Sequence, residues 1–162
     1  MHKLSPIFLA GFLLFGTAAL ASNPLEERTA ALATRYLKVW SLDGAASVRN
    51  VPILYERATT FYGRTYTHHE LMAEKRRAIR RWPIRHYAHH PGTMRIKCDS
   101  PNRRCFARSV IDFRVASPQR GTVNRGSAKF VLGINFARPS PRIFYEGGSV
   151  NTRRAMPRSR SS

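Results

Sequence analysis

The sequence changes its hydrophobic period at Pro83, and this change constrains the fold more than any other feature. Before Pro83, apart from a short strand expected over residues 59–62, apolar residues recur at the three- to four-residue spacing of amphipathic helices. After it, apolar residues alternate with other residue types in 94–98 and 128–136, the pattern of half-buried strands. Because the residue before proline avoids helical geometry, the preceding helix must end near Trp82. Early helices and late strands predict an α+β fold, with helices on one face of a curved sheet.

Caps, prolines and alternation place the individual elements. Asn23 and Pro24 predict the start of a first helix, and a short second helix is expected over residues 44–51, ended by Pro52. Thr67 begins the capping-box pattern T-x-x-E, which predicts the start of a third helix. The expected strands cover residues 59–62, 84–89, 94–98, 105–116, 128–137 and 142–145. Residues 117–126 are predicted to form a polar loop.

Residues 1–21 have the three regions of a secretory signal peptide. Lys3 supplies a positive start, residues 7–15 are apolar, and small residues end the segment at Ala21. Cleavage near Ala21 would give a periplasmic or secreted protein, and an uncleaved N-terminal anchor is the alternative. Residues 22–150 then form one domain of ordinary size, and residues 151–162 are predicted to be a disordered basic tail.

The chain is strongly basic, with 28 Lys and Arg against nine Asp and Glu and a formal net charge of +19. A field of this sign attracts anionic polymers, lipid surfaces and small anions. The alternative is that the basic residues only keep the surface soluble.

The two cysteines, Cys98 and Cys105, are expected to form a structural disulfide that closes the end of a hairpin, since export permits oxidation. They lack the CxxC spacing of zinc sites, and the histidine doublets project in different directions, so no metal site is expected. The motifs of phosphate-binding loops, dinucleotide-binding folds and serine hydrolases are absent, and no cofactor is expected.

Several short segments carry a family resemblance: residues 61–64 (FYGR), Lys75, residues 81–87 (RWPIRHY), residues 110–113 (VIDF) and residues 142–147 (RIFYEG). This pattern, YYGR…K…RWPxRxY, resembles small uncharacterised exported or periplasmic bacterial domains of the NTF2-like superfamily. That superfamily has the cone-shaped, cystatin-like fold of SnoaL-like and ketosteroid-isomerase-like proteins. The resemblance covers most of the mature chain and implies about three helices in the N-terminal half, packed on a curved antiparallel sheet. It leaves activity open, because one scaffold hosts enzymes and non-catalytic binders.

The resemblance implies candidate catalytic residues, since enzymes of this superfamily use an acid inside the cone as base, with Tyr or His donors. Asp112 or Glu146 would be the base and Tyr62 the donor. Asp112 alternates with the apolar Ile111 and Phe113, so a cross-strand arginine partner is the alternative. Alternation does not place Glu146, because it shares a face with Phe144 while Ile143 and Tyr145 form an equally plausible inward-facing set. Acids this outnumbered are expected to be ion-paired, which makes a poor base.

Arginines and tyrosines are the candidate ligand-binding residues. Arg85 and Tyr87 point to the same face of their strand, and on a concave face they would bind an anionic ligand. Arg64 and Arg114 are further candidates for this role. The alternative for the tyrosines is a place in the core, with the hydroxyl at its rim.

These patterns favour a non-catalytic exported domain that binds an anionic envelope polymer, a lipid surface or a small anionic ligand. The first alternative is a small-molecule enzyme of the SnoaL or ketosteroid-isomerase type. The second is a scaffold component of an envelope complex, for which a homodimer would be expected. Nucleic acid is not favoured as a partner, because residues 75–81 are expected to be the solvated flank of an amphipathic helix.

Overall fold

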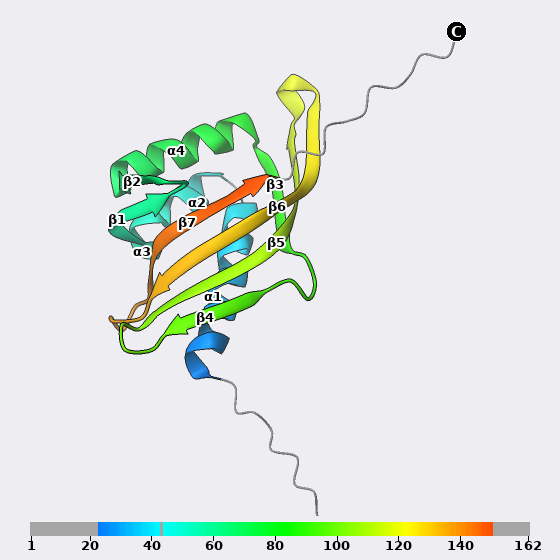
Figure 1. Ribbon diagram of the computed structural model, residues 1–162. Coiled ribbons are helices and arrows are strands. Elements are labelled where there is room, and N and C mark those ends of the chain that lie inside the picture. The colour runs from blue at the N-terminus through cyan, green and yellow to red at the C-terminus, as the bar shows by residue number, and fades with distance from the viewer. Residues whose placement is uncertain (1–22, 43, 151–162) are drawn as a thin grey trace, which may run out of the picture.

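The computed structural model describes residues 23–42 and 44–150, which form a mixed sheet with helices against one face (Figure 1). The elements, in chain order, are α1 (Pro24–Ser41), α2 (Gly44–Arg49), α3 (Val51–Leu54), β1 (Tyr55–Phe61), β2 (Arg64–Thr67), α4 (His68–Arg81), β3 (Ile84–His89), β4 (Arg95–Asp99), β5 (Arg104–Ser117), η1 (Pro118–Arg120), β6 (Thr122–Asn135) and β7 (Arg142–Val150). The expected signal peptide (1–21) and basic tail (151–162) lie outside the described residues. None of the helices in residues 23–42 and 44–150 combines the length and the hydrophobicity that spanning a bilayer requires.

Both long helices begin where their caps predict. In α1, the side-chain oxygen of Asn23 accepts a hydrogen bond from the Leu25 backbone N–H. At α4, the Thr67 hydroxyl accepts from the Glu70 N–H, and the Glu70 carboxylate accepts from the Thr67 N–H. This reciprocal pair satisfies donors that a helix start otherwise leaves without a partner. α4 ends at Arg81, as the following Trp-Pro pair predicts.

The predicted helix over residues 44–51 is wrong at its C-terminal end. α2 ends at Arg49, and Pro52 lies in the first turn of the separate short helix α3. Proline is tolerated there because the N–H it lacks would have no helical partner in a first turn. Pro52 therefore belongs to the start of a helix and does not terminate one.

The sheet has the strand order β2-β1-β7-β6-β5-β3, and β4 also pairs with β5. β3 pairs with residues 111–116 of β5, and β4 pairs with residues 104–108. Every pairing is antiparallel except that between β1 and β7, which is parallel. The predicted α+β class is confirmed, and the parallel pair is the departure from a purely antiparallel sheet. It joins strands far apart in the chain, so no short turn dictates their relative direction.

The predicted polar loop over residues 117–126 is wrong. β5 and β6 continue as a long hairpin until Ser117 pairs with Thr122, and the turn is η1 followed by Gly121 in a left-handed conformation. Residues 122–126 are exposed. A strand that is wet on both faces needs no apolar alternation, so its sequence looks like that of a loop.

A bulge in β7 decides which of its side chains face inward. Neighbouring residues of β6 pair with Ile143 and Tyr145, which leaves Phe144 as an extra residue. A bulge shifts the alternation of side chains by one position. Ile143 and Glu146 are consequently both buried, although they would lie on opposite faces of a regular strand.

The hydrophobic core lies between α1 and the sheet, and Figure 1 shows α1 crossing behind the strands. The buried residues of α1 include Ala33, Tyr36, Leu37 and Trp40. The strands contribute inward-facing apolar residues, among them Ile111, Phe130 and Leu132.

Cys98 and Cys105 form the predicted disulfide between β4 and β5, where they are direct cross-strand partners. It closes the turn that joins these strands, and a loop of this size contributes about 2 kcal/mol to stability.

Candidate ligand-binding site

A pocket of about 180 Å³ lies between α1, α4 and the inner face of the sheet, and we call it the inner pocket. Its walls are largely aromatic, with side chains from α1, β1, β3, β6 and the β1–β2 turn: Tyr36, Trp40, Phe61, Tyr62, Tyr87 and Phe130. Lys75 of α4 and Glu146 of β7 also line it. Pockets for drug-sized ligands measure about 300–1,000 Å³, so the inner pocket suits a compact ligand.

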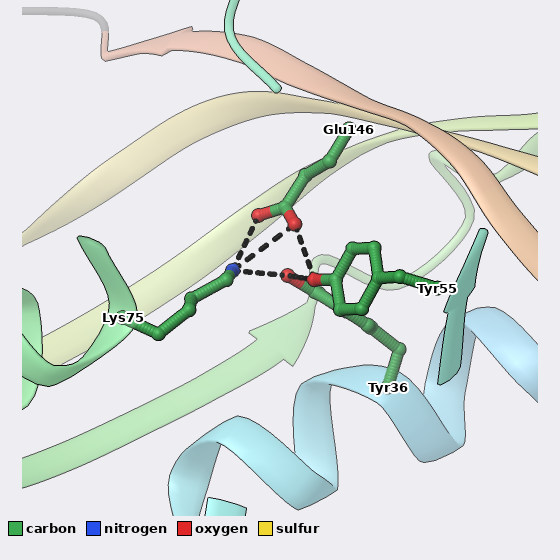
Figure 2. A network of polar contacts seen from close by, with 4 residues as sticks. All are labelled: Tyr36, Tyr55, Lys75 and Glu146. Atoms are coloured by element: carbon green, nitrogen blue, oxygen red, sulfur yellow. Dashed lines mark hydrogen bonds and ion pairs between the residues drawn. The ribbon is translucent and has the colours of Figure 1, made fainter. Parts of the chain in front are cut away.

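Four side chains from four different elements meet in a polar network at this pocket (Figure 2). Lys75 Nζ lies 3.0 Å from each carboxylate oxygen of Glu146 and 3.0 Å from the Tyr36 hydroxyl. The Tyr55 hydroxyl donates to Glu146 Oε2 at 2.6 Å. The two tyrosine oxygens are 3.2 Å apart. The capping box sets where α4, which carries Lys75, begins, and the bulge in β7 turns Glu146 toward the inside.

Aromatic rings surround the ammonium group of Lys75. Its Nζ lies 4.3 Å from the centroid of a Trp40 ring and 4.7 Å from that of Phe61. The rings of Tyr36 and Tyr55 follow at 5.6 and 5.8 Å. An ammonium near ring faces gains about 0.5–2 kcal/mol per favourable contact, so the rings help to replace the water that burial removes.

Burial dominates the electrostatics of this network. It lowers the pKa of the Lys75 amine, and the neighbouring Glu146 carboxylate opposes that effect. Burial also raises the pKa of the Tyr36 and Tyr55 hydroxyls well above their ordinary value, and the charge of Glu146 raises both further. Both phenols are therefore neutral hydrogen-bonding groups at physiological pH.

The Glu146 carboxylate is engaged within the polar network through both of its oxygens. Both oxygens of Glu146 accept hydrogen bonds from Lys75, and one also accepts from Tyr55. The two opposite charges also offset each other, so this part of the pocket has no net charge.

Solved structures share this architecture, whereas no protein-family model and no curated protein matches the sequence. An NTF2-like superfamily protein from Salmonella enterica superposes with a TM-score of 0.66 at 10% identity, covering 83% of this chain and 96% of that one. A protein with a cystatin-like fold from Caulobacter vibrioides superposes with a TM-score of 0.58 at 10% identity, and the match covers 76% of this chain and 87% of that one. Aln2 from a Streptomyces species superposes with a TM-score of 0.61 at 14% identity, and the match covers 80% of this chain and 92% of that one.

The chain has the NTF2-like fold. The cone expected from the sequence is thereby confirmed, and the inner pocket lies between the helices and the inner face of its sheet. At these identities the likeness concerns the path of the backbone and carries no residue role from one chain to another.

Within this NTF2-like domain, four of the candidate residues line the inner pocket: Glu146, Tyr62, Arg85 and Tyr87. Glu146 lies in the polar network, and Tyr87 is half-buried on β3. Tyr62 is 54% exposed and has a positive φ of 47°. Its backbone N–H donates to the carbonyl oxygen of Glu146, which holds the β1–β2 turn against β7.

Arg85 is positioned by backbone contacts that account for its burial. Its Nε donates to the carbonyl of Trp40 and its Nη2 to that of Leu42, at the C-terminal end of α1. Its Nη1 donates to the carbonyls of Trp82 and Pro83. Cations near helix C-termini satisfy carbonyls that have no helical partner. Arg85 therefore fastens α1 and the end of α4 to β3, which differs from the anion-binding role expected from the sequence.

The other three candidates lie away from the pocket. Asp112 is on the outer face of β5, where it accepts one hydrogen bond from the Ser127 hydroxyl and contacts His90 at 2.8 Å. The expected arginine partner of Asp112 is therefore wrong, because the register places Ser127 opposite it. Arg114 is exposed on the same outer face, and Arg64 is exposed on β2. The structure does not bring these residues together with Arg85 and Tyr87.

Sequence reasoning missed three residues of the network: Lys75, Tyr36 and Tyr55. Lys75 carried a signal, because it stands between Leu71 and Ile79 on the apolar stripe of α4. A lone cation in such a stripe needs a buried partner. Nothing in the sequence connects it with Glu146, which lies 71 residues further along the chain.

Proposed function

We propose that this NTF2-like domain is a non-catalytic binding protein whose inner pocket takes a compact, uncharged, ring-sized ligand. The observation that carries the proposal is the Lys75–Glu146 ion pair inside aromatic walls. Aromatic walls favour an apolar body, and the Lys75–Glu146 ion pair is already neutral. The guanidinium of Arg85 also lines the pocket, but it donates to four backbone carbonyls, so a charged ligand gains little net attraction.

The ligand is proposed to carry a hydrogen-bond acceptor. The indole Nε1 of Trp40 is buried and makes no hydrogen bond of good geometry with the described residues, although its polarity acts on the Tyr55 hydroxyl and partly offsets the rise in pKa that burial causes there. A buried donor without a partner costs about 1–3 kcal/mol, and Trp40 lines the pocket. An oxygen of a bound phenol or ketone would supply the acceptor.

Export to the envelope is part of the same proposal. The signal-peptide pattern of residues 1–21 supports it, and so does the Cys98–Cys105 disulfide, since disulfides persist in oxidising compartments. Mass spectrometry of the protein recovered from a bacterial periplasm would test it. A mass matching a chain that begins after Ala21 is the expected result.

Ligand binding can be followed by the fluorescence of Trp40. The chain has two tryptophans, so a Trp82→Phe background isolates the one that lines the pocket. Phenol, benzoate and benzylamine have the same ring with neutral, negative and positive character. We expect phenol to change the fluorescence at the lowest concentration, with benzoate and benzylamine weaker by about tenfold, the factor for about 1.4 kcal/mol.

A filled pocket provides the matched control. Ile111 lines the pocket, whereas Ile84 is 50% exposed and does not. Ile111→Phe should abolish the phenol response, and Ile84→Phe should leave it unchanged. Equal responses in both variants, or tightest binding of benzoate, would contradict the proposal.

One observation favours the alternative of a small-molecule enzyme: Glu146 lines an apolar pocket beside a tyrosine donor, Tyr55. The double variant Lys75→Met/Glu146→Leu distinguishes the two functions, because it removes both the base and its ion pair. A binding protein should keep its phenol response within about threefold, less than 1 kcal/mol. An isomerase or dehydratase should lose all turnover of its substrate.

A further inference from the structure

The outer face of the sheet, opposite the inner pocket, carries a cluster of cations on β4 and β5. Arg104 and Arg108 alternate along β5 with the buried Cys105 and Ala107, so their side chains face outward. The register places cations of β4 beside them, with Arg95 opposite Arg108. We call the following residues the outer basic cluster: Arg95, Lys97, Arg104 and Arg108.

Aromatic side chains support two of these arginines. The guanidinium of Arg104 lies 4.9 Å from the ring centroid of Phe144, and that of Arg108 lies 5.2 Å from that of Phe106. The Phe106 ring also packs edge-on against Phe144 and Tyr145, with centroids 5.3 and 5.8 Å away. Stacking restricts the arginine side chains, so less conformational freedom is lost when they bind a ligand.

The glycine beneath these rings allows them to pack this way. A Cβ atom at Gly133 would lie 2.8 Å from Phe144 and 3.0 Å from Phe106. Both distances are far below ordinary carbon contacts of about 3.5–4.0 Å. The packing of Phe106 against Phe144 therefore depends on the absence of a side chain at Gly133 of β6.

The charge of the cluster is not cancelled locally. All four cations are exposed, and none forms an ion pair with a carboxylate in the described part of the chain. Asp99 is the acid nearest in register, opposite Arg104, and its carboxylate accepts hydrogen bonds from Asn102. Asp112, further along the same face, contacts Ser127 and His90.

We propose that the outer basic cluster binds an acidic polysaccharide. The arginine forks match carboxylate and phosphate groups in two-point contacts, and cations repeated along β4 and β5 match a linear chain of anions. Proteins that bind single-stranded nucleic acid stack bases on open ring faces. Here guanidinium groups cover faces of Phe106 and Phe144, so an acidic polysaccharide fits better than a nucleic acid. This site and its ligand are independent of the inner pocket.

The test measures binding of the full chain to polygalacturonate, a linear polyuronate, at low and at moderate NaCl concentration. Arg104→Gln/Arg108→Gln should weaken binding about tenfold or more at low salt, because two charge-assisted contacts are lost. The control, Arg76→Gln/Arg80→Gln, removes the same charge from exposed positions of α4. It should weaken binding less than about threefold, since it alters only the general field.

Three outcomes would overturn the proposal. Equal losses in the two double variants would mean that net charge alone drives binding. Tighter binding to an oligo-dT strand, or to anionic phospholipid vesicles, would assign the face to another class of partner. A third variant, Arg104→Lys/Arg108→Lys, keeps the charge but removes the forks. It should bind several-fold more weakly than the wild type, and full affinity would refute two-point recognition by arginine.

Discussion

Burying Lys75 or Glu146 alone would cost free energy, because the charge would have no counter-ion. Together they form an ion pair in which each charge compensates the other. Lys75→Met should therefore lower the free energy of unfolding by about 3–5 kcal/mol, since it leaves the carboxylate buried without a counter-ion. Urea unfolding followed by circular dichroism measures the change.

The control for this prediction removes both charges. Lys75→Met/Glu146→Leu should recover most of the lost stability, because well-packed apolar side chains can replace a buried ion pair at little cost. If the double variant is as unstable as Lys75→Met, the unpaired charge is not the cause of the loss.

Tyr36 and Tyr55 make stability depend on pH in the alkaline range. Burial raises the pKa of both hydroxyls well above 10.0, so the folded state holds these protons more tightly than the unfolded chain does. Their contribution is complete below pH about 10, the unfolded value, and falls above it by about 1.4 kcal/mol per pH unit for each tyrosine. Tyr36→Phe should make this fall shallower in urea unfolding between pH about 9 and 11.5. Identical slopes in the variant and the wild type would contradict it.

For individual residues, the sequence predicted the contacts that lie within short segments. The Cys98–Cys105 bond and the reciprocal Thr67–Glu70 cap follow from spacing alone. The partner of Asp112 could not be predicted in this way, because cross-strand neighbours depend on register. The register places Ser127, and no arginine, opposite Asp112 on β6.

Among the elements, α4 depends most visibly on its cap. Thr67→Ala removes one half of the capping box and should lower the free energy of unfolding by about 1 kcal/mol. Thr34→Ala is the matched control, because Thr34 is exposed within α1 and its hydroxyl donates to the carbonyl of Ala30 in the same helix. It should be neutral or slightly stabilising, since alanine favours helix interiors. A comparable loss in both variants would exclude capping as the cause.

Predictions from the hydrophobic pattern were wrong where a strand is exposed to solvent or contains a bulge. Residues 122–126, the β6 arm at the far end of the β5–β6 hairpin, are all exposed, so their polar sequence was predicted as a loop. The bulge at Phe144 places Ile143 and Glu146 on the same side, which alternation in a regular strand forbids.

For the molecule as a whole, the net charge of +19 should oppose the compact state. Raising NaCl from about 0.01 M to about 0.15 M shortens the Debye length from about 30 Å to about 8 Å. The thermal unfolding midpoint should rise over this range, as calorimetry would measure. A midpoint that falls or stays constant would mean that local pairing already balances the charge.

The class of fold, the disulfide and most helix and strand positions could be predicted from local sequence, because they depend on periodicity, caps and prolines acting over short distances. The tertiary structure alone decided the site. It brought Lys75 and Glu146 together through the bulge in β7, surrounded them with aromatic rings from other elements, and assigned Arg85 to the end of α1. Burial and long-range register set these contacts, and neither is encoded in the local pattern of any one segment.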